Sequence, residues 1–543
     1  MANGIFKIPF PKNETLLNYG RGAPEKVALK AKIAELKSAE IEIPLIIGGN
    51  EIKTGKLGDC RCPHDHKHLL GRYHKAGERE VNMAVAASQK AWKEWSIMPW
   101  EARASIFLKA AQLLAGNWRA TLNAATMLGQ SKTVIQAEGD AIGALVDYWH
   151  YNPYFMQKIY EIQPESSAGI WNTIEWRPLE GFIFAVTPFN FVSIAGNLPT
   201  APALMGNTVL WKPASSGVYP AYFIMKLLQE AGLPDGIINF IPGSGNKVGY
   251  PVIKNEWFSG LHFTGSTEVF RDMWQKIGDN IPNYRNYPRI VGETGGKDFI
   301  FAHPSAELDS LAVATIRSAF EYQGQKCSAA SRMYVPQSIW HELKIRLITM
   351  VEKIRIGNPE DFRNFISAVI DKAAFDSITN YIEYARNSDE AEFLIGGTYD
   401  GSTGYFIDPT IIVTTNPKFK TMEEEIFGPV ITVYVYPDNE FEETLHLCDE
   451  TSPFALTGAI FAQERNAIET ARRILTHSAG NFFINDKPSG VMIGHQPFGG
   501  GRASGTNDKA GSIMNLLRWV SPRTTKENFL PPKNFTYPHM DEM

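Results

Sequence analysis

Cysteine is scarce in this chain, which has only Cys60, Cys62, Cys327 and Cys448 among 543 residues. Four cysteines cannot supply the disulfide framework of a secreted protein of this length, so we expect a reducing compartment. No stretch approaches 18 consecutive apolar residues, and we expect no membrane-spanning helix. The N-terminus has neither the apolar core of a signal peptide nor an Arg-rich transit helix. We therefore expect a cytoplasmic protein, with the mitochondrial matrix as the alternative in a eukaryote.

An excess of positive charge is also absent. Lys and Arg total 53 against 58 Asp and Glu, a net charge of −5, so no basic field attracts nucleic acid. Hydrophobic residues make up 44% and charged residues 20%, the composition of a folded globular protein. A chain of 543 residues exceeds what one core usually organises, so we expect at least two domains and a small-molecule partner.

Apolar strands alternate with helical patterns over residues 181–293. The strand-like segments are GFIFAVTP, NTVLWKP, IINFIPG, GLHFTGS and RIVGETGG. This alternation predicts a parallel sheet covered on both faces, a doubly wound α/β domain for which nucleotide binding is the default function. A second alternation follows, with FIFA, a helix over residues 308–322, RMYVP and a helix over residues 339–354. It predicts a second α/β domain.

Other patterns mark the segments outside these domains. Apolar residues three and four apart predict helices over residues 81–114, with Gly116 as a stop signal. The Trp-rich segment 170–177 predicts an exposed hairpin, and the tail from Ser521, rich in Pro, Lys and Asn, predicts an extended arm. Because such arms often meet another subunit, we expect a homodimer or a larger homo-oligomer.

Cys327 lies in YQGQKCSAASR, between a predicted helix and a predicted strand, and Lys326 precedes it. A thiolate beside a cation has a lowered pKa and is a competent nucleophile, whereas a lone cysteine is more often a buried structural residue. Glu293 ends an apolar strand, where it could be a general base or an ordinary surface carboxylate. Asn190 follows another strand, where it could hold an oxyanion or cap a turn. For each of these three residues taken alone, the non-catalytic interpretation has the higher prior.

A run of potential metal ligands is formed by Cys60, Cys62, His64, His66 and His68. Structural zinc sites usually use paired ligands about two to five residues apart, whereas alternation at a period of two sends neighbouring positions to opposite faces of a strand. We therefore predict an edge strand or loop here, and no metal site.

Several motifs in a fixed order together resemble the aldehyde dehydrogenase superfamily. They are Asn190 in TPFNF, Lys212 in LWKP, Gly265 and Ser266 in FTGST, Glu293 in GETGGK, Cys327 in GQKCS and Glu425 in EEIFGPV. The resemblance runs from about residue 47 to residue 519. It implies an α/β fold with a Rossmann-like doubly wound NAD-binding domain, a second α/β catalytic domain and a small β oligomerisation arm.

The resemblance also implies a role for each motif residue. Cys327 would attack an aldehyde, Asn190 and the Cys327 backbone N–H would hold the oxyanion, and Glu293 would activate the water that hydrolyses the thioester. NAD would be the cofactor, and NADP stays open because Ser215 stands where some members carry a Glu that repels a 2′-phosphate. The residues implied to bind the cofactor are Thr187, Pro188, Phe189, Lys212, Ser215, Gly245, Gly249, Gly265, Ser266, Glu293, Glu425 and Phe427.

By the same resemblance the chain divides into six segments. They are an N-terminal segment with helices of the NAD-binding domain (1–151), an oligomerisation hairpin (152–180), the NAD-binding domain (181–293), the catalytic domain (294–480), a substrate anchor loop with a return to the NAD-binding domain (481–519) and a C-terminal oligomerisation arm (520–543).

Longer stretches, among them KTVIQAEGDA and NFFINDKPSGVMIGHQPFGG, are similar to the 1-pyrroline-5-carboxylate dehydrogenase branch. This branch oxidises glutamate 5-semialdehyde, the open form of 1-pyrroline-5-carboxylate, to glutamate in the second step of proline catabolism. The implied substrate residues are Phe191, Ser328, Ser489, Gly490, Val491 and Phe498. Val491 replaces a serine of some relatives, which removes one hydrogen bond to the substrate carboxylate, worth about 1 kcal/mol. Glu138 borders the substrate tunnel in this branch, but a helical carboxylate is more often a solvated surface group.

Three other interpretations stay open. The chain could oxidise a different small aldehyde. It could be a non-catalytic protein on the same fold, although the presence of Cys327, Glu293 and Asn190 together argues against this. It could also be related to bifunctional proline-utilisation proteins, but it has no room for a flavin-binding barrel of about 250 residues. A separate proline dehydrogenase partner would then be expected.

Overall fold

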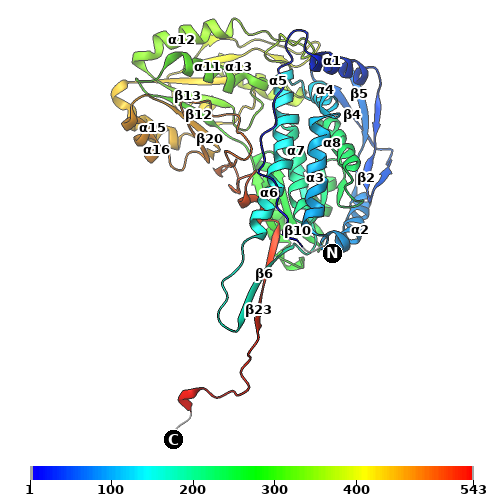
Figure 1. The fold of residues 1–543 in the computed structure, drawn as a ribbon. Coiled ribbons are helices and arrows are strands. Elements are labelled where there is room, and N and C mark those ends of the chain that lie inside the picture. The colour runs from blue at the N-terminus through cyan, green and yellow to red at the C-terminus, as the bar shows by residue number, and fades with distance from the viewer. Residues whose placement is uncertain (1–3, 541–543) are drawn as a thin grey trace.

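The computed structural model describes residues 4–540, so the first three and last three residues of the predicted terminal segments lie outside it. Two seven-stranded sheets, each with helices around it, form the body, and a two-stranded ribbon projects away from them (Figure 1). No helix in residues 4–540 is long and apolar enough to cross a membrane.

The first sheet has the order β11-β10-β7-β8-β9-β2-β3. Its strands are β11 (Arg289–Glu293), β10 (Phe258–Thr264), β7 (Phe182–Thr187), β8 (Thr208–Pro213), β9 (Ile238–Phe240), β2 (Leu45–Ile47) and β3 (Asn50–Ile52). From β7 to β11 the strands are parallel, because a helix crosses over between each consecutive pair. These helices are α7 (Val192–Leu204), α8 (Val218–Ala231), α9 (Gly245–Lys254) and α10 (Thr267–Asp279).

Side chains of β7 alternate between two hydrophobic cores. Ile183 and Ala185 belong to the core under α3, α6, α7 and α8, whereas Phe182, Phe184 and Val186 belong to the core under α2, α9 and α10. Figure 1 shows α3, α6, α7 and α8 side by side on one face of the sheet. A strand that is buried on both faces reads as one continuous apolar run, which is why the sequence revealed it. The predicted doubly wound domain is confirmed.

The N-terminal part of the chain adds strands that the sequence did not reveal. β2 pairs antiparallel with β9 and β3, so the predicted parallel sheet has an antiparallel edge. A separate three-stranded sheet contains β1 (Ile41–Ile43), β5 (Asp65–His74) and β4 (Leu57–Cys62). Cys60 and Cys62 lie in β4, an edge strand of this sheet, as predicted. Both side chains are buried. The described residues contain no group of three or more His, Cys, Asp or Glu arranged to hold a metal ion.

The helices predicted over residues 81–114 are confirmed as α2 (Glu78–Trp95) and α3 (Trp100–Ala115), and Gly116 ends α3. The remaining N-terminal helices are α1 (Pro24–Lys37), α4 (Arg119–Gln130), α5 (Val134–Ala137), the π-helix η1 (Glu138–Ala144) and α6 (Leu145–Tyr160).

The second sheet has the order β14-β17-β18-β13-β12-β20-β21, and only β14 is antiparallel to its neighbour. Its strands are β14 (Ala391–Ile395), β17 (Thr410–Thr414), β18 (Val430–Tyr436), β13 (Ala330–Pro336), β12 (Asp298–Ala302), β20 (Thr457–Phe461) and β21 (Asn481–Ile484). The predicted second α/β domain is confirmed. Its helices are α11 (Leu308–Phe320), α12 (Gln337–Val351), α13 (Lys372–Arg386), α15 (Phe441–Glu450) and α16 (Arg465–Ile474).

The hairpin predicted within residues 152–180 is wrong. Residues 152–160 complete α6, and β6 (Ile170–Pro178) is a single strand that pairs antiparallel with β23 (Val520–Asn528). Alternation within β6 shows that it is a strand, but it cannot show that its partner lies at the other end of the chain. The C-terminal tail is extended, as predicted, and forms the outer part of the projecting ribbon (Figure 1).

Candidate active site

The order of the first sheet reverses between β7 and β10, and several predicted site residues lie at the carboxyl ends of these strands. Thr187 ends β7, Gly265 and Ser266 follow β10, and Glu293 ends β11. In a doubly wound sheet, ligands bind in the crevice at such a reversal. Three separate sequence motifs therefore meet at one edge.

Two helix N-termini flank this crevice. Ser266 caps α10, since its hydroxyl accepts from Val269 N at 3.4 Å. Gly245 begins α9, and a Cβ placed there would meet no heavy atom within 4 Å. At Gly249 a Cβ would lie 3.3 Å from Met273 Cε, so glycine lets α9 pack closely on α10. Open helix N-termini favour anions, such as the pyrophosphate of a dinucleotide.

Lys212 and Glu425 fit the expected cofactor. The described residues give the Lys212 ammonium one hydrogen-bond partner, the Pro213 carbonyl at 3.3 Å, and burial lowers the Lys212 pKa to about 8. Glu425 accepts from Gly296 N at 2.8 Å, and burial raises its pKa to about 7. Both side chains keep hydrogen-bonding capacity for ribose hydroxyls. A Cβ at Gly295 would lie 2.3 Å from Glu425 Oε2, so the GETGG glycines allow this approach.

The other predicted cofactor residues surround the same crevice. Phe427, with a left-handed φ of 57°, packs edge-on against Phe189 with 5.9 Å between ring centres. A Cβ at Gly217 would lie 3.5 Å from the Pro188 carbonyl oxygen, so glycine keeps this turn close to β7. Ser215 is exposed at the start of the turn.

Cys327 follows an unusual turn after α11. Tyr322, Gln323 and Gly324 all have left-handed φ, of 53°, 56° and 66°. Each non-glycine residue in this conformation costs about 1–3 kcal/mol, which surrounding bonds must offset. Gln323 Nε2 donates to the Ala368 carbonyl at 2.6 Å, one such bond. Contacts with other parts of the chain therefore fix the conformation of this turn, and with it the position of Cys327.

Asn190 and Glu293 lie against this nucleophile turn. Asn190 Nδ2 donates to the Gln325 carbonyl at 3.1 Å, and the amide has a second N–H to offer. A Cβ at Gly296 would lie 2.2 Å from the Cys327 carbonyl oxygen, so the segment after Glu293 contacts the turn backbone to backbone. The structure thus brings the three predicted catalytic residues together.

A cavity of about 720 Å³ opens onto Cys327. Of the predicted substrate residues, Phe191, Ser328, Gly490, Val491 and Phe498 line it. Ser489 does not; its hydroxyl is buried and has no partner among the described residues. The cavity is also lined by Lys326 and by Tyr148, Glu321 and Lys487, three residues that sequence motifs did not single out.

The sequence profile of the aldehyde dehydrogenase family matches residues 52–524. The chain belongs to the aldehyde dehydrogenase family. The mitochondrial delta-1-pyrroline-5-carboxylate dehydrogenase of Dictyostelium discoideum is 53% identical over 536 residues, which cover 98% of this chain and 96% of that protein. The human protein of the same name is 45% identical over 529 residues, covering 97% and 94%. The structure also resembles the crystal structure of the Mycobacterium tuberculosis delta-pyrroline-5-carboxylate dehydrogenase bound with NAD, at a TM-score of 0.96 and 46% identity, covering 100% of both chains.

Of the two interpretations left open for Lys326, the structure favours a structural role. Its ammonium pairs with Glu321 at 3.0 Å. Burial, and after it the charge of Glu293, raises the Cys327 pKa well above its ordinary value. Burial raises the pKa of Glu293 to about 8.

A buried ion pair that sequence reasoning missed supports the substrate side of the site. Lys132 pairs with Asp140, whose carboxylate accepts from the N–H groups of Val192 at 2.8 Å and Ser193 at 3.0 Å. These groups begin α7, two and three residues after Asn190. The Lys132 ammonium also lies 4.7 Å from the centre of the Phe191 ring. The spacing of Lys132 and Asp140 in KTVIQAEGD was the only signal in the sequence.

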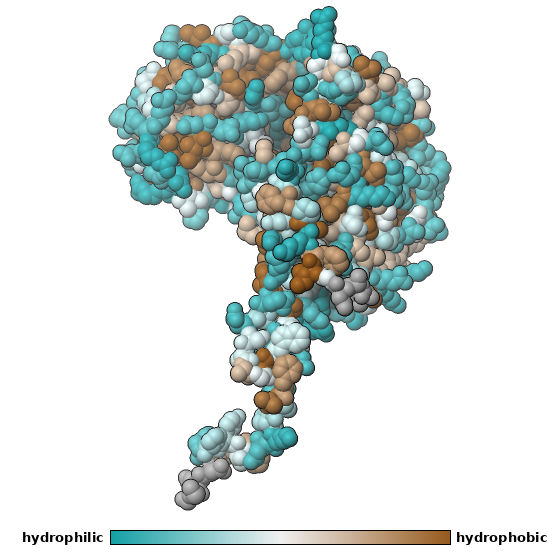
Figure 2. Space-filling model, in the orientation of Figure 1, coloured by the Kyte–Doolittle hydropathy of each residue, from teal (hydrophilic) through white to brown (hydrophobic). Residues whose placement is uncertain are grey.

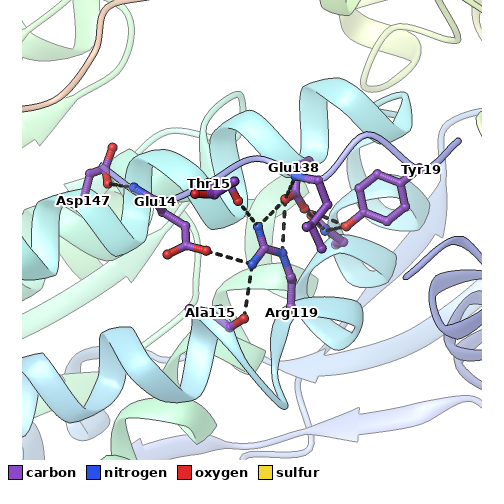
Figure 3. Close-up of polar contacts among 9 residues, drawn as sticks. Glu14, Thr15, Tyr19, Ala115, Arg119, Glu138 and Asp147 are labelled. Atoms are coloured by element: carbon purple, nitrogen blue, oxygen red, sulfur yellow. Dashed lines mark hydrogen bonds and ion pairs between the residues drawn. The ribbon is translucent and has the colours of Figure 1, made fainter. Parts of the chain in front are cut away.

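Glu138 is not a solvated surface group. Its side chain is fully buried and pairs with Arg119, as Figure 3 shows. It accepts hydrogen bonds from Leu17 N at 2.9 Å and from the Tyr19 hydroxyl at 2.7 Å. Glu138 does not line the cavity; it binds the N-terminal segment to the helices.

Proposed function

We propose that this aldehyde dehydrogenase oxidises L-glutamate 5-semialdehyde, the open form of 1-pyrroline-5-carboxylate, to glutamate with NAD, the second step of proline catabolism. Relatives that match nearly its whole length carry the corresponding name, and structures of similar fold were solved with NAD. The observation that carries the proposal is a cavity that joins Cys327 to a wall containing Lys326, Lys487 and the backbone of Gly490.

That wall suits an aldehyde with a carboxylate at its far end. Lys326 and Lys487 both place their ammonium groups on one oxygen of Glu321, at 3.0 and 3.2 Å. Each ammonium has three N–H groups and makes one hydrogen bond among the described residues, so both keep donors for a substrate carboxylate. Lys487 Nζ lies 3.7 Å from the position of a Cβ on Gly490, beside the backbone predicted to hold the carboxylate. A carboxylate here would gain charge-assisted hydrogen bonds.

Residues 489–496, called the substrate loop below, complete this end of the cavity. Gly490 and Val491 contribute to the wall, and Val491 packs with Phe498 near Cys327. In the proposed binding mode, the backbone N–H groups of the loop hold the substrate carboxylate. The apolar side chains contact the methylene groups of the substrate.

In the proposed reaction, Cys327 Sγ loses its proton to a base and bonds to the aldehyde carbon. Asn190 Nδ2 and the Cys327 backbone N–H donate to the resulting oxyanion. NAD, when bound, accepts the hydride that leaves this carbon, and a thioester on Cys327 remains. The Glu293 carboxylate then takes a proton from the attacking water, and glutamate leaves as the C–S bond breaks. A base with a pKa near 8 suits this step.

We further propose a homodimer or larger homo-oligomer built on the ribbon. Figure 2 shows brown apolar residues along this projection, which would lie in water in a single chain. The exposed apolar side chains there are Trp171, Phe529, Leu530, Phe535 and Tyr537. Apart from the hairpin, the predicted segment limits are also proposed. So are a separate proline dehydrogenase partner and a cytoplasmic location, with the mitochondrial matrix as alternative. Sedimentation of the purified chain tests the oligomer.

The substrate is tested by NADH absorbance with equilibrated 1-pyrroline-5-carboxylate, succinic semialdehyde and propanal as parallel substrates. We expect the largest kcat/KM with 1-pyrroline-5-carboxylate. A larger kcat/KM with either simple aldehyde would contradict this substrate and favour the alternative of another small aldehyde.

A further inference from the structure

The beginning of the chain has no helix or strand, yet buried groups hold it in place. Residues 13–19, the N-terminal strap, lie along α4, η1 and α6 (Figure 3). Glu14 N donates to Asp147 Oδ1 at 2.7 Å, and Leu17 N donates to Glu138 Oε1 at 2.9 Å. Because both carboxylates are buried, these backbone bonds are protected from water. The strap is a fixed part of the molecule.

Asn13 connects the strap to the substrate loop. Its Nδ2 donates to Asp147 Oδ2 at 2.7 Å and to the Ile493 carbonyl at 2.8 Å. Its Oδ1 accepts from the Tyr151 hydroxyl at 3.0 Å and contacts His495 Nε2 at 3.0 Å. A side-chain amide can donate two hydrogen bonds and accept two, and Asn13 uses all four. Two of its partners belong to a loop 480 residues further along the chain.

The substrate loop meets the body at the same place. Ile493 packs on Tyr148 and Tyr151 of α6. Gly494 has φ of 84°, and a Cβ there would lie 2.1 Å from the Tyr151 ring, so only glycine permits this approach. The bonds to Asn13 flank this glycine on both sides. They fix the part of the loop that follows the predicted carboxylate-binding residues.

The strap also reaches the cavity itself. Leu16 contributes to the cavity wall. A Cβ at Gly143 would lie 2.6 Å from Leu16 Cδ2, so a glycine in η1 makes room for this side chain. Two residues of one short segment therefore act on the substrate end of the site, one through the loop and one directly.

We propose that Asn13 is a positioning residue for substrate recognition, which holds the substrate loop so that its N–H groups face the substrate carboxylate. The proposal rests on the proposed function, in which this loop binds that carboxylate. Cys327, Asn190 and Glu293 lie on other elements. Loss of Asn13 should therefore weaken substrate binding and raise KM, while kcat stays nearly unchanged.

The test compares Asn13→Ala with Asn18→Ala in the full chain. Asn18 lies in the same strap, is exposed, and accepts from the neighbouring Gly20 N at 2.9 Å, so it is a matched control. We expect KM for 1-pyrroline-5-carboxylate to rise about fivefold or more in Asn13→Ala, the factor for loss of one to two hydrogen bonds. It should change less than about twofold in Asn18→Ala. KM for NAD should stay constant in both.

Hydrogen exchange of residues 490–496 supplies a second readout that needs no substrate. Exchange should be faster in Asn13→Ala and equal to wild type in Asn18→Ala. His495→Ala removes one bond at an exposed residue and should accelerate the same exchange, even if Asn13→Ala does not fold.

Unchanged exchange in Asn13→Ala, or in His495→Ala should Asn13→Ala not fold, would overturn the role of Asn13. An equal rise of KM for NAD and substrate would also overturn it, because that result indicates general damage. If the wild type oxidised only simple aldehydes, the proposed function would fail. The exchange comparison would still decide whether Asn13 holds the loop.

Discussion

Replacement of Glu138 by Gln tests whether the buried charge cluster holds the N-terminal strap. The Glu138 oxygens accept from Arg119, Leu17 N, the Tyr19 hydroxyl and Asn123 Nδ2. Burial raises the Glu138 pKa, but these bonds, led by that of Arg119, bring it below its ordinary value. The group is therefore a charged carboxylate with every bonding direction engaged (Figure 3).

The free-energy cost of Glu138→Gln follows from the hydrogen-bonding groups that the glutamine would leave unpaired. Its NH₂ group would face donors, and Arg119 would lose its buried partner. Removing one partner of a buried ion pair costs about 3–5 kcal/mol. Arg119 keeps Glu14 at 2.9 Å and the Thr15 carbonyl at 2.7 Å, so we expect the lower limit, about 3 kcal/mol. Since about 1.4 kcal/mol is a factor of ten, opening of the strap should become about 100-fold more favourable.

Hydrogen exchange of the Leu17 amide measures this opening directly, because that N–H donates to Glu138. We expect about 100-fold faster exchange in Glu138→Gln. Glu14→Gln is the control: among the described residues the Glu14 carboxylate accepts a single hydrogen bond, from Arg119, so its loss should cost about 1 kcal/mol and exchange should rise at most about fivefold. Exchange within about threefold of wild type in Glu138→Gln would refute this account of the cluster.

Three further predictions concern the site. Burial raises the Glu293 pKa to about 8, so the carboxylate fraction grows with pH, and single-turnover thioester hydrolysis should accelerate between about pH 7 and 9. A Glu293→Gln enzyme that keeps this acceleration would exclude Glu293 as the base. Val491→Ser should lower KM for 1-pyrroline-5-carboxylate about fivefold by adding one hydrogen bond to its carboxylate, and an unchanged or higher KM in steady-state assays would contradict that binding mode. Lys487→Met should raise the same KM about tenfold or more and leave KM for propanal unchanged, whereas parallel changes for both aldehydes would rule out a role in carboxylate recognition.

The parts of the fold that the sequence predicts are those in which burial leaves a regular pattern. β7, β8 and β10 are buried along their whole length and rich in apolar residues, and α8 and α10 show helical spacing, so the doubly wound sheet could be predicted. Because Asn190 follows β7 and Glu293 ends β11, the sheet order explains why these two predicted catalytic residues converge. By contrast, β2 and β3 have three residues each, too few to show a period.

Features that depend on distant partners could not be predicted. The pairing of β6 with β23, the burial of Glu138 beneath the strap, and the hold of Asn13 on the substrate loop join segments that no local pattern connects. The left-handed turn before Cys327 uses Tyr322 and Gln323, which are not turn-forming residues. The pKa of Cys327 depends on where the Lys326 ammonium points, which its place in the sequence does not fix.

In the proposed function, Cys327 carries out the covalent oxidation of glutamate semialdehyde. The most direct measurement is NADH formation from equilibrated 1-pyrroline-5-carboxylate and NAD by the wild type and by Cys327→Ala at equal concentration. We predict rapid formation by the wild type and none above the enzyme-free rate by Cys327→Ala. NADH formation by Cys327→Ala at the wild-type rate would contradict the mechanism.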